Sequence, residues 1–235
     1  RIVAVSGIDY VSNPYILAHK DSIKDMGPEM NYELLLGLKP DIVLLYGIGD
    51  AQTAITDKLK ELSIPYIYMG EYLEESPLGK AEWMVVLSEL TDSREKGIEI
   101  FSEIPKRYLS LKALTESVGQ CPTVMFNMPW NDSWVMPSTK SYMAQLVADA
   151  GAEYIYKENS SNSSTPIGLE TAYGLIQKAD YWINVGSATS LDELKTVNPK
   201  FADAKAVRER TVYNNNLRLT PTGGNDYWES AVVRP

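Results

Sequence analysis

Apolar segments with the composition of β-strands alternate with helical segments in the first part of the chain, and this alternation limits the fold more than any other feature. Residues 41–46 form an almost continuous apolar run, an amphipathic helical pattern follows at 51–62, and a second strand-like run occupies 65–69. A strand, a helix and a strand in this order predict βαβ units around a buried parallel sheet. We therefore predict an α/β fold, with a further strand at 2–5 and a further helix at 33–38.

The same alternation returns after Gly119. The residues there predict strands at 124–126, 154–156 and 181–185 and helices at 140–150 and 169–178. In both halves a helix leads through a Lys-x-Asp sequence into a strand that a glycine follows, at Gly47 and at Gly186. This repetition favours two similar lobes over one continuous sheet.

A long helical pattern separates the two halves. Ser76 is typical of a helix start, and Asp92 followed by Glu95 is typical of another. Apolar residues then recur every three or four positions, although Pro105 is expected to kink or split this helix. We predict an N-terminal lobe at 1–88, a connecting backbone helix at 89–118 and a C-terminal lobe at 119–235.

The composition excludes several kinds of site. The chain has 235 residues, with 31 Asp and Glu against 22 Lys and Arg and a net charge of -9. We expect no nucleic-acid partner, because an acidic surface repels phosphates. Cys121 is the single cysteine and His19 the single histidine, so neither an internal disulfide nor a zinc or copper site of the usual His and Cys type can form. We expect no cofactor and no metal site, and no apolar run is long enough to span a membrane.

The ends of the sequence carry no recognisable targeting segment. The chain opens directly on the predicted strand at 2–5, and it stops at Pro235 without an element that would seal the core of the second lobe. We expect the sequence to be an excerpt of a longer precursor, truncated at both ends.

Candidate ligand contacts follow from the predicted parallel sheets. In open α/β sheets, ligands bind beyond the carboxyl ends of the strands, in concave sites with aromatic walls and a few polar groups. The candidates are the aromatic and polar residues that follow the predicted strands, one helical tyrosine and a late glycine loop, namely Tyr10, Tyr46, Gly47, Glu71, Tyr72, Trp130, Trp134, Met136, Tyr142, Gly224 and Asn225.

The sequence leaves an alternative open for two groups of these candidates. One loop is expected to contain Trp130, Trp134 and Met136. These side chains either contact a ligand or cover the core of their own lobe. The backbone N–H groups around Gly224 and Asn225 either meet an acidic group of a ligand or belong to a plain turn. Basic residues are scarce near these loops, which favours a bulky, weakly charged ligand such as a corrinoid over an anionic ferric tris-catecholate.

Catalytic and nucleotide-binding motifs are missing from the sequence. Gly47 and Gly49 begin a pattern similar to a dinucleotide loop, but Gln52 stands where the third glycine is needed, and no Gly-Lys-Ser/Thr loop occurs. No pair of nucleophile and base is visible either. The alternatives that stay open are an α/β enzyme with a two-lobed plan, either a transferase or a metal chelatase, and a structural or sensory relative that has lost its ligand.

Four ordered blocks of residues resemble a known family. The first covers 27–43 and includes Asn31, Glu33 and the sequence Lys39-Pro40-Asp41 before a hydrophobic strand; the others are 74–83, 141–152 and 223–229. In these blocks the chain resembles the helical-backbone, or class III, periplasmic substrate-binding proteins, which serve ABC importers of cobalamin, haem and ferric siderophores. The last block is similar to a loop of the branch from Bacteroides-like bacteria.

The resemblance implies two Rossmann-like lobes joined by a long backbone helix, with a ligand cleft between the lobes. It implies a non-enzymatic protein that captures an iron chelate, either a siderophore or haem, or cobalamin. It also implies a periplasmic location, with any lipid anchor upstream of Arg1, and docking on the permease and ATPase subunits of a transporter.

The resemblance further implies an acidic docking residue on each lobe. In the first lobe the family position falls in the helix after the second strand, where this chain has Asp50 and Asp57, with the uncharged Gln52 between them. In the second lobe the counterparts are Asp192 and Glu193. The alternative is an ordinary acidic first turn of a helix, which the helix dipole stabilises.

Overall fold

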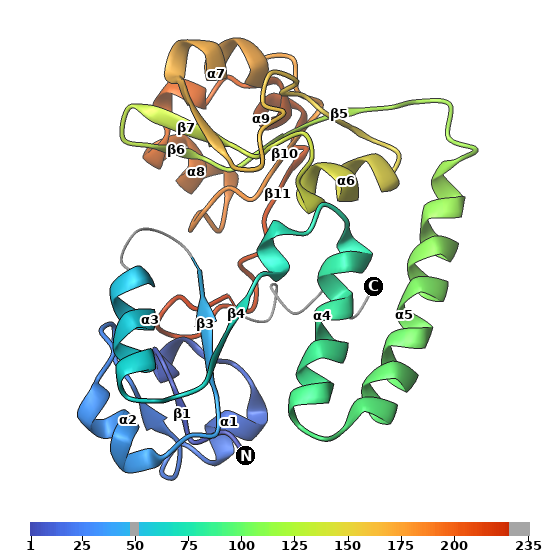
Figure 1. Ribbon diagram of the computed structural model, residues 1–235. Helices are drawn as coiled ribbons and strands as arrows, with labels where there is room; N and C mark the ends of the chain where they lie inside the picture. Colours follow the sequence, from blue (N-terminus) through green and yellow to red (C-terminus); the bar gives the residue numbers. More distant parts are fainter. Residues whose placement is uncertain (48–51, 226–235) are drawn as a thin grey trace. The chain divides into compact units, whose positions relative to one another are not determined.

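The computed structural model of the chain describes residues 1–47 and 52–225 (Figure 1). These residues form two compact units: unit 1 contains 1–72 and 219–225, and unit 2 contains 73–218. The structure therefore assigns 73–118, which we predicted as the end of the first lobe and a connecting helix, to unit 2. The return of the chain to unit 1 at Leu219 also differs from the predicted C-terminal lobe, which was continuous.

The strands of unit 1 pair in parallel, as the βαβ pattern predicts. β1 (Ala4–Val5) pairs with β2 (Lys24–Asp25), and β3 (Val43–Tyr46) pairs with β4 (Tyr66–Met69), so the unit has two two-stranded sheets. Its helical elements are η1 (Ile8–Tyr10), α1 (Pro14–Ala18), α2 (Tyr32–Leu38), α3 (Gln52–Glu61) and η2 (Glu71–Leu73), which crosses the unit boundary. The predicted strands and helices of the first 72 residues are confirmed, with ends that shift by one or two residues.

The ends of α2 follow from its sequence. Asn31 precedes the helix, and its Oδ1 accepts a hydrogen bond from the backbone N–H of Leu34 at 2.9 Å. Lys39 ends the helix in the left-handed conformation, with φ 47°, and the following Pro40 has no N–H to continue it. The chain then enters β3, and the main buried apolar cluster of unit 1 consists of Met26, Leu35, Leu45 and Leu59.

Unit 2 begins with two helices, α4 (Pro77–Leu90) and α5 (Arg94–Thr115), which lie side by side (Figure 1). α4 begins where predicted, because the Oγ of Ser76 accepts a hydrogen bond from the N–H of Gly79 at 2.9 Å. The predicted cap of α5 is wrong, since Ser93 precedes the helix and Asp92, with φ 53°, lies in the turn before it. Pro105 lies inside α5 and does not divide it.

Helix α5 is tied to its neighbours at two points. A Cβ atom added to Gly97 would collide with Ser88 of α4, so a glycine is needed where the two helices meet. Nearer the end of α5, the hydroxyl of Tyr108 donates to Asp149 at 2.7 Å, and Lys112 forms an ion pair with the same carboxylate at 2.7 Å. Asp149 ends α6 (Tyr142–Asp149), and α5 is therefore attached to the body of unit 2.

The main sheet of unit 2 is parallel, with four strands in the order β11-β10-β5-β8. The strands are β5 (Thr123–Phe126), β8 (Glu153–Tyr154), β10 (Tyr181–Ile183) and β11 (Val212–Tyr213). The remaining helical elements are α7 (Leu169–Ile176), α8 (Leu191–Val197), η3 (Pro199–Phe201) and α9 (Lys205–Glu209). The predicted elements of the second half are confirmed in type and order, and most are shorter than predicted.

The loop that we predicted between β5 and α6 is wrong, because this segment contains a β-hairpin. β6 (Pro129–Trp130) pairs with β7 (Ser133–Met136), and β7 pairs with β9 (Thr165–Gly168), all antiparallel. Asn131 and Asp132 form the turn of the hairpin, and Asn131 has φ 54°, a conformation that asparagine adopts more readily than most residues. The polar turn between two very short strands gave the segment the composition of a loop.

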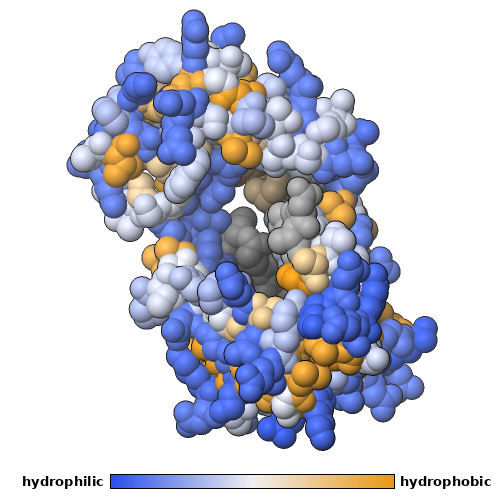
Figure 2. Space-filling view, turned by 60° about the vertical axis from the view of Figure 1, so that its left-hand side comes forward, coloured by the Kyte–Doolittle hydropathy of each residue, from blue (hydrophilic) through white to orange (hydrophobic). Residues whose placement is uncertain are grey.

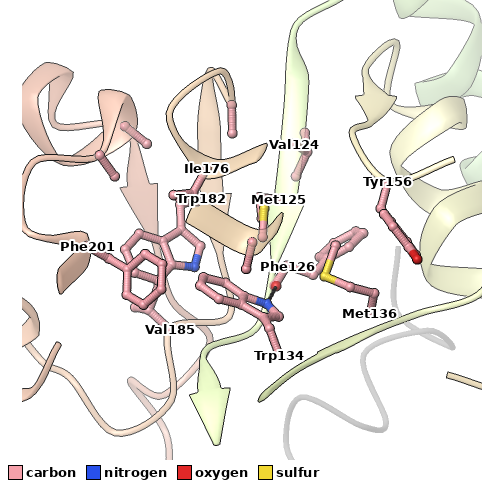
Figure 3. Close-up of a cluster of buried hydrophobic side chains, with 14 of the residues drawn as sticks. Val124, Met125, Phe126, Trp134, Met136, Tyr156, Ile176, Trp182, Val185 and Phe201 are labelled. Carbon is pink, nitrogen blue, oxygen red and sulfur yellow. Dashed lines mark hydrogen bonds between the residues drawn. The ribbon is translucent and has the colours of Figure 1, made fainter. Parts of the chain in front are cut away.

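The core of unit 2 contains several aromatic side chains in contact (Figure 3). The rings of Trp134 and Trp182 lie 5.6 Å apart, and Phe201 packs edge-on against Trp134 at 5.1 Å. The indole N–H of Trp134 donates to the carbonyl oxygen of Phe126 at 2.7 Å, so the buried polar atom is satisfied. These contacts join the hairpin to the parallel sheet.

The surface of the molecule differs from this core. The face shown in Figure 2 is mostly hydrophilic, and its hydrophobic residues occur in small groups. Within the described part of the chain, no helix is long and apolar enough to cross a membrane.

Candidate functional site

The carboxyl ends of β3 and β4 bring three of the predicted ligand residues together in unit 1. The rings of Tyr46 and Tyr72 lie 4.6 Å apart, and the hydroxyl of Tyr72 donates to the carbonyl oxygen of Gly47 at 2.6 Å. A Cβ atom at Gly47 would lie 3.0 Å from the ring of Tyr68, so the glycine permits the aromatic rings to pack around it. Tyr46 remains 48% exposed, which leaves an aromatic surface at this edge of the sheet.

Glu71 and Asn225 each have a buried oxygen that lacks a hydrogen-bond donor among the described residues. These atoms are Oε2 of Glu71, directly after β4, and Oδ1 of Asn225. Both are acceptors, and a buried acceptor without a donor destabilises the protein. A ligand that supplies N–H or O–H groups would relieve this cost.

The late glycine loop packs against η1 within unit 1. A Cβ atom at Gly224 would collide with the backbone of Tyr10, and the hydroxyl of Thr222 donates to the carbonyl oxygen of Asp9. The N–H of Gly224 donates to Thr220 at 2.8 Å, so the loop itself uses this group. Of the two explanations that the sequence left open for Gly224, the structure supports the turn. Tyr10 is 57% exposed beside this loop.

A groove of about 460 Å³ lies between η1, α1 and this loop. Its lining includes Ile8, Val11, Leu17 and Pro221, together with the ion pair of Lys20 and Asp9. The groove is mainly apolar, and its size falls in the range of small-molecule sites. None of the ligand residues that we predicted lines it.

The hairpin of unit 2 separates the three residues that we expected in one loop. Trp130 is 75% exposed, whereas Trp134 and Met136 are completely buried in the core (Figure 3). For Trp134 and Met136, the structure therefore supports the alternative that they cover the core of their own lobe. In β7, Trp134 and Met136 are buried while Val135 between them is exposed, as strand geometry requires.

Tyr142, in the first turn of α6, has a partner inside unit 2. The ammonium group of Lys80 lies 4.3 Å from the centre of its ring, in a cation–π contact. Lys80 itself is only 9% exposed. The contact holds the tyrosine ring against α4.

The acidic residues predicted for docking have different environments. Asp50 and the side chain of Gln52 lie outside the described residues, and Asp57 forms an exposed ion pair with Lys60 at 3.4 Å. Glu193 accepts hydrogen bonds from the N–H of Thr189 at 2.8 Å and from its hydroxyl at 2.7 Å.

These bonds hold the pKa of Glu193 below its ordinary value, and they fix its carboxylate against Thr189 at the start of α8. The side chain of Asp192 is 96% exposed. Of the two residues predicted for unit 2, Asp192 is therefore the one that presents its carboxylate to solvent.

Sequence reasoning missed four amide side chains at the carboxyl edge of the parallel sheet of unit 2. Asn127 follows β5, Asn184 follows β10, and Asn214 and Asn216 follow β11. We call these four residues the amide edge. The available signal was their position, since Asn127, Asn184 and Asn214 each stand immediately after a strand.

No group of three or more His, Cys, Asp or Glu side chains is placed to hold a metal ion within the described residues. The groups gathered at the strand ends of both units are aromatic rings, amides and isolated acceptors. This set is suited to binding a ligand by contact and hydrogen bonding.

The sequence from residue 2 to residue 216 matches the periplasmic binding protein family. The match covers most of the chain, and the chain belongs to this family, whose members are non-enzymatic components of transport. An uncharacterized lipoprotein of Methanocaldococcus jannaschii is 26% identical over 207 residues, which are 87% of this chain and 47% of that protein. The chain spans about half the length of the two lipoproteins of this archaeon that it matches. These relatives do not support the Bacteroides-like branch.

Solved structures share the fold at low sequence identity. The periplasmic haem-binding protein HutB of Vibrio cholerae has a TM-score of 0.71 and 15% identity, with 99% of this chain and 88% of that chain covered. The triscatecholate siderophore-binding protein FeuA of Bacillus subtilis has a TM-score of 0.69 and 16% identity, with 99% and 81% covered. The vitamin B12-binding protein BtuF of Vibrio cholerae has a TM-score of 0.67 and 16% identity, with 99% and 85% covered. The α/β fold is that of class III periplasmic binding proteins.

Proposed function

We propose that the protein is the substrate-binding component of an ABC importer and that it captures a metal chelate. The chelate is an iron complex, either a siderophore or haem, or it is cobalamin. Membership of the periplasmic binding protein family supports the transport role. The ligands of HutB, BtuF and FeuA, which share the fold, support the class of cargo.

The observation that carries the proposal is the placement of exposed aromatic side chains at the strand ends of both units. Tyr46, whose ring packs against the half-buried Tyr72, provides such a surface after β3, and Trp130 provides one in the hairpin that follows β5. Large, rigid rings bury much apolar area at low entropic cost, and planar or bulky chelates present matching surfaces.

The location and docking of the protein are part of the same proposal. We propose an extracytoplasmic protein with a lipid anchor upstream of Arg1, because two of its archaeal relatives are named as lipoproteins. Docking on the permease would use Asp57 and Asp192, whose carboxylates are exposed. The role of α5 as a backbone helix and the capture of the ligand in a cleft between lobes stay predictions from the family resemblance.

Tryptophan fluorescence of the full-length protein tests the proposal. Titration with cyanocobalamin, haemin and ferric siderophores should give saturable quenching by one ligand at micromolar concentration or below. Trp130→Phe should remove most of the quenching, whereas Trp83→Phe, at a half-buried indole that donates to Glu74 at 2.8 Å, should keep it. A folded protein that responds to none of these chelates would contradict the proposal.

A further inference from the structure

The amide edge of unit 2 is a chain of fixed hydrogen bonds. The Nδ2 of Asn184 donates to Oδ1 of Asn127 at 2.8 Å, and the Nδ2 of Asn127 donates to the carbonyl oxygen of Val135 in β7 at 3.0 Å. Both asparagines have left-handed backbone conformations, with φ 61° and 68°. The two amides are therefore held in one orientation, next to the hairpin that carries Trp130.

The side chains after β11 extend this arrangement. The Nδ2 atoms of Asn214 and Asn216 both donate to the carbonyl oxygens of Gly186 and Ala188, at 2.8 to 3.3 Å. The loop after β10 is thus fastened to the loop after β11. All four residues of the amide edge are partly exposed, so they remain within reach of a ligand.

The amide edge keeps unused hydrogen-bonding capacity. A side-chain amide has two N–H donors and an oxygen that accepts two bonds. Among the described residues, Asn184 and Asn127 each use one N–H in the bonds given above, and Oδ1 of Asn184 receives no donor. The edge therefore presents both donors and acceptors.

The loops that form this edge carry few charges. Residues 127–131, 184–190 and 214–217 include neither acidic nor basic side chains, and Asp132 and Arg218 directly follow two of these ranges. Their exposed apolar residues are Trp130 and Leu217, at 75% and 92% exposure. Sites for polyanions are instead built from arginine and lysine, which neutralise the ligand and donate to its oxygens.

We infer that the amide edge, together with Trp130, contacts the ligand and selects a chelate with an uncharged, hydrogen-bonding periphery, of the carboxamide or hydroxamate kind, over a polyanionic chelate. The inference rests on the proposed function, because it names the ligand class of the same protein.

Calorimetric titration of the full-length protein with probes of different charge tests the inference. The probes are cyanocobalamin and ferrichrome, which carry no net charge, and a ferric tris-catecholate, which is a trianion. We expect at least one uncharged probe to bind more tightly than the trianion by about ten-fold or more, the effect of one or two hydrogen bonds.

A substitution at Leu217, an exposed position next to the amide edge, sharpens the test without disturbing the fold. Leu217→Lys adds a cation beside Asn216 and breaks no hydrogen bond, and it should raise the affinity for the trianion by about three-fold or more, less so in high salt. Val197→Lys makes the same change at a 53% exposed position at the end of α8, and it should have no such effect.

Asn184→Asp and Asn216→Asp test the amides themselves. Each replaces N–H donors with an acceptor, and each should weaken the uncharged probe by about ten-fold. Asn162→Asp, in the exposed loop before β9, is the matched control and should bind like the wild type. Thermal unfolding identifies any variant that fails to fold. In that case the comparison of Leu217→Lys with Val197→Lys tests the inference.

The outcomes separate the inference from the proposed function. If the trianion binds most tightly, the inference is wrong and the proposed function stands. The same holds if Leu217→Lys, Asn184→Asp and Asn216→Asp all bind every probe like the wild type. If the folded wild-type protein binds haemin but none of these probes, the inference is wrong and the proposed function stands. If it binds neither haemin nor any of the probes, the proposed function itself is wrong.

Discussion

Unit 1 and unit 2 both contain parallel strands, but they differ in how much apolar surface they bury. Within the described residues, the cluster of buried apolar side chains in unit 1 has four members, whereas that in unit 2 has twenty, including Trp134 and Trp182. Burial of apolar area is the main favourable contribution to folding. From this difference we expect unit 2 to be the more stable of the two units.

The largest expected effect comes from the core of unit 2. Trp134→Ala removes a completely buried ring and leaves a cavity beside Trp182 and Phe201, so it should lower the free energy of unfolding by about 3–5 kcal/mol. Trp130→Ala, at an exposed indole, should change it by about 0.5 kcal/mol or less. Urea denaturation of both variants measures the difference, and equal effects would show that the hairpin does not belong to the core.

The next effect tests the small core of unit 1. Leu59 is completely buried in α3, and Leu59→Ala should cost about 2–4 kcal/mol. Hydrogen exchange should then accelerate in β3, β4 and α2, while the strands of unit 2 keep their protection. Faster exchange throughout both units would mean that they unfold together and that the comparison fails.

A smaller effect concerns Asp180, which directly precedes β10 and is bonded to Thr123 in β5 and Lys205 in α9. It accepts hydrogen bonds from the hydroxyl and N–H of Thr123 and from Lys205. Lys205, and then the N–H of Thr123, lower the pKa of Asp180 to about 2 from 3.8. A lowered pKa in the folded state contributes stability above the ordinary pKa, and this contribution is lost as the pH falls through about 2.

Asp180→Asn should therefore destabilise unit 2 at pH 7 by about 1 kcal/mol, a value reduced for the partial exposure of the side chain. The difference from the wild type should shrink as the pH falls from 4 to 2, in denaturation curves recorded across that interval. A difference that stays constant with pH would exclude the ionised carboxylate as its source.

The smallest effects compare helix caps in the two units. Asn31 caps α2 in unit 1 and Ser76 caps α4 in unit 2, each through a bond of 2.9 Å. Asn31→Ala and Ser76→Ala should each cost about 1 kcal/mol. Thermal unfolding measures both, and a negligible effect of either would show that its helix end is held by packing alone.

The sequence predicted the parts of the fold that depend on local pattern. The apolar strands at 43–46 and 66–69, the cap at Ser76 and the second βα series all form as expected. The division of the chain was harder to predict, because α4 and α5 join unit 2 through Asp149 and other contacts that are distant in sequence. The hairpin was missed because its two short strands flank a polar turn.

The candidate site was predictable in part. Tyr46, Gly47 and Tyr72 come together because the carboxyl ends of parallel neighbouring strands meet at one edge. The burial of Trp134 could not be predicted, because exposure of a tryptophan depends on the face of a strand that was not recognised. The amide edge was missed because a lone asparagine after a strand is common, and only the sheet order β11-β10-β5 places three of them side by side.

Titration of the full-length protein with cyanocobalamin, haemin and ferric siderophores, followed by recovery of the ligand, tests the central claim most directly. The account predicts one-to-one binding of one chelate at micromolar concentration or below, loss of affinity in Trp130→Ala, and recovery of a chemically unchanged ligand. A folded protein that binds none of these chelates, or that converts the one it binds, would contradict the account.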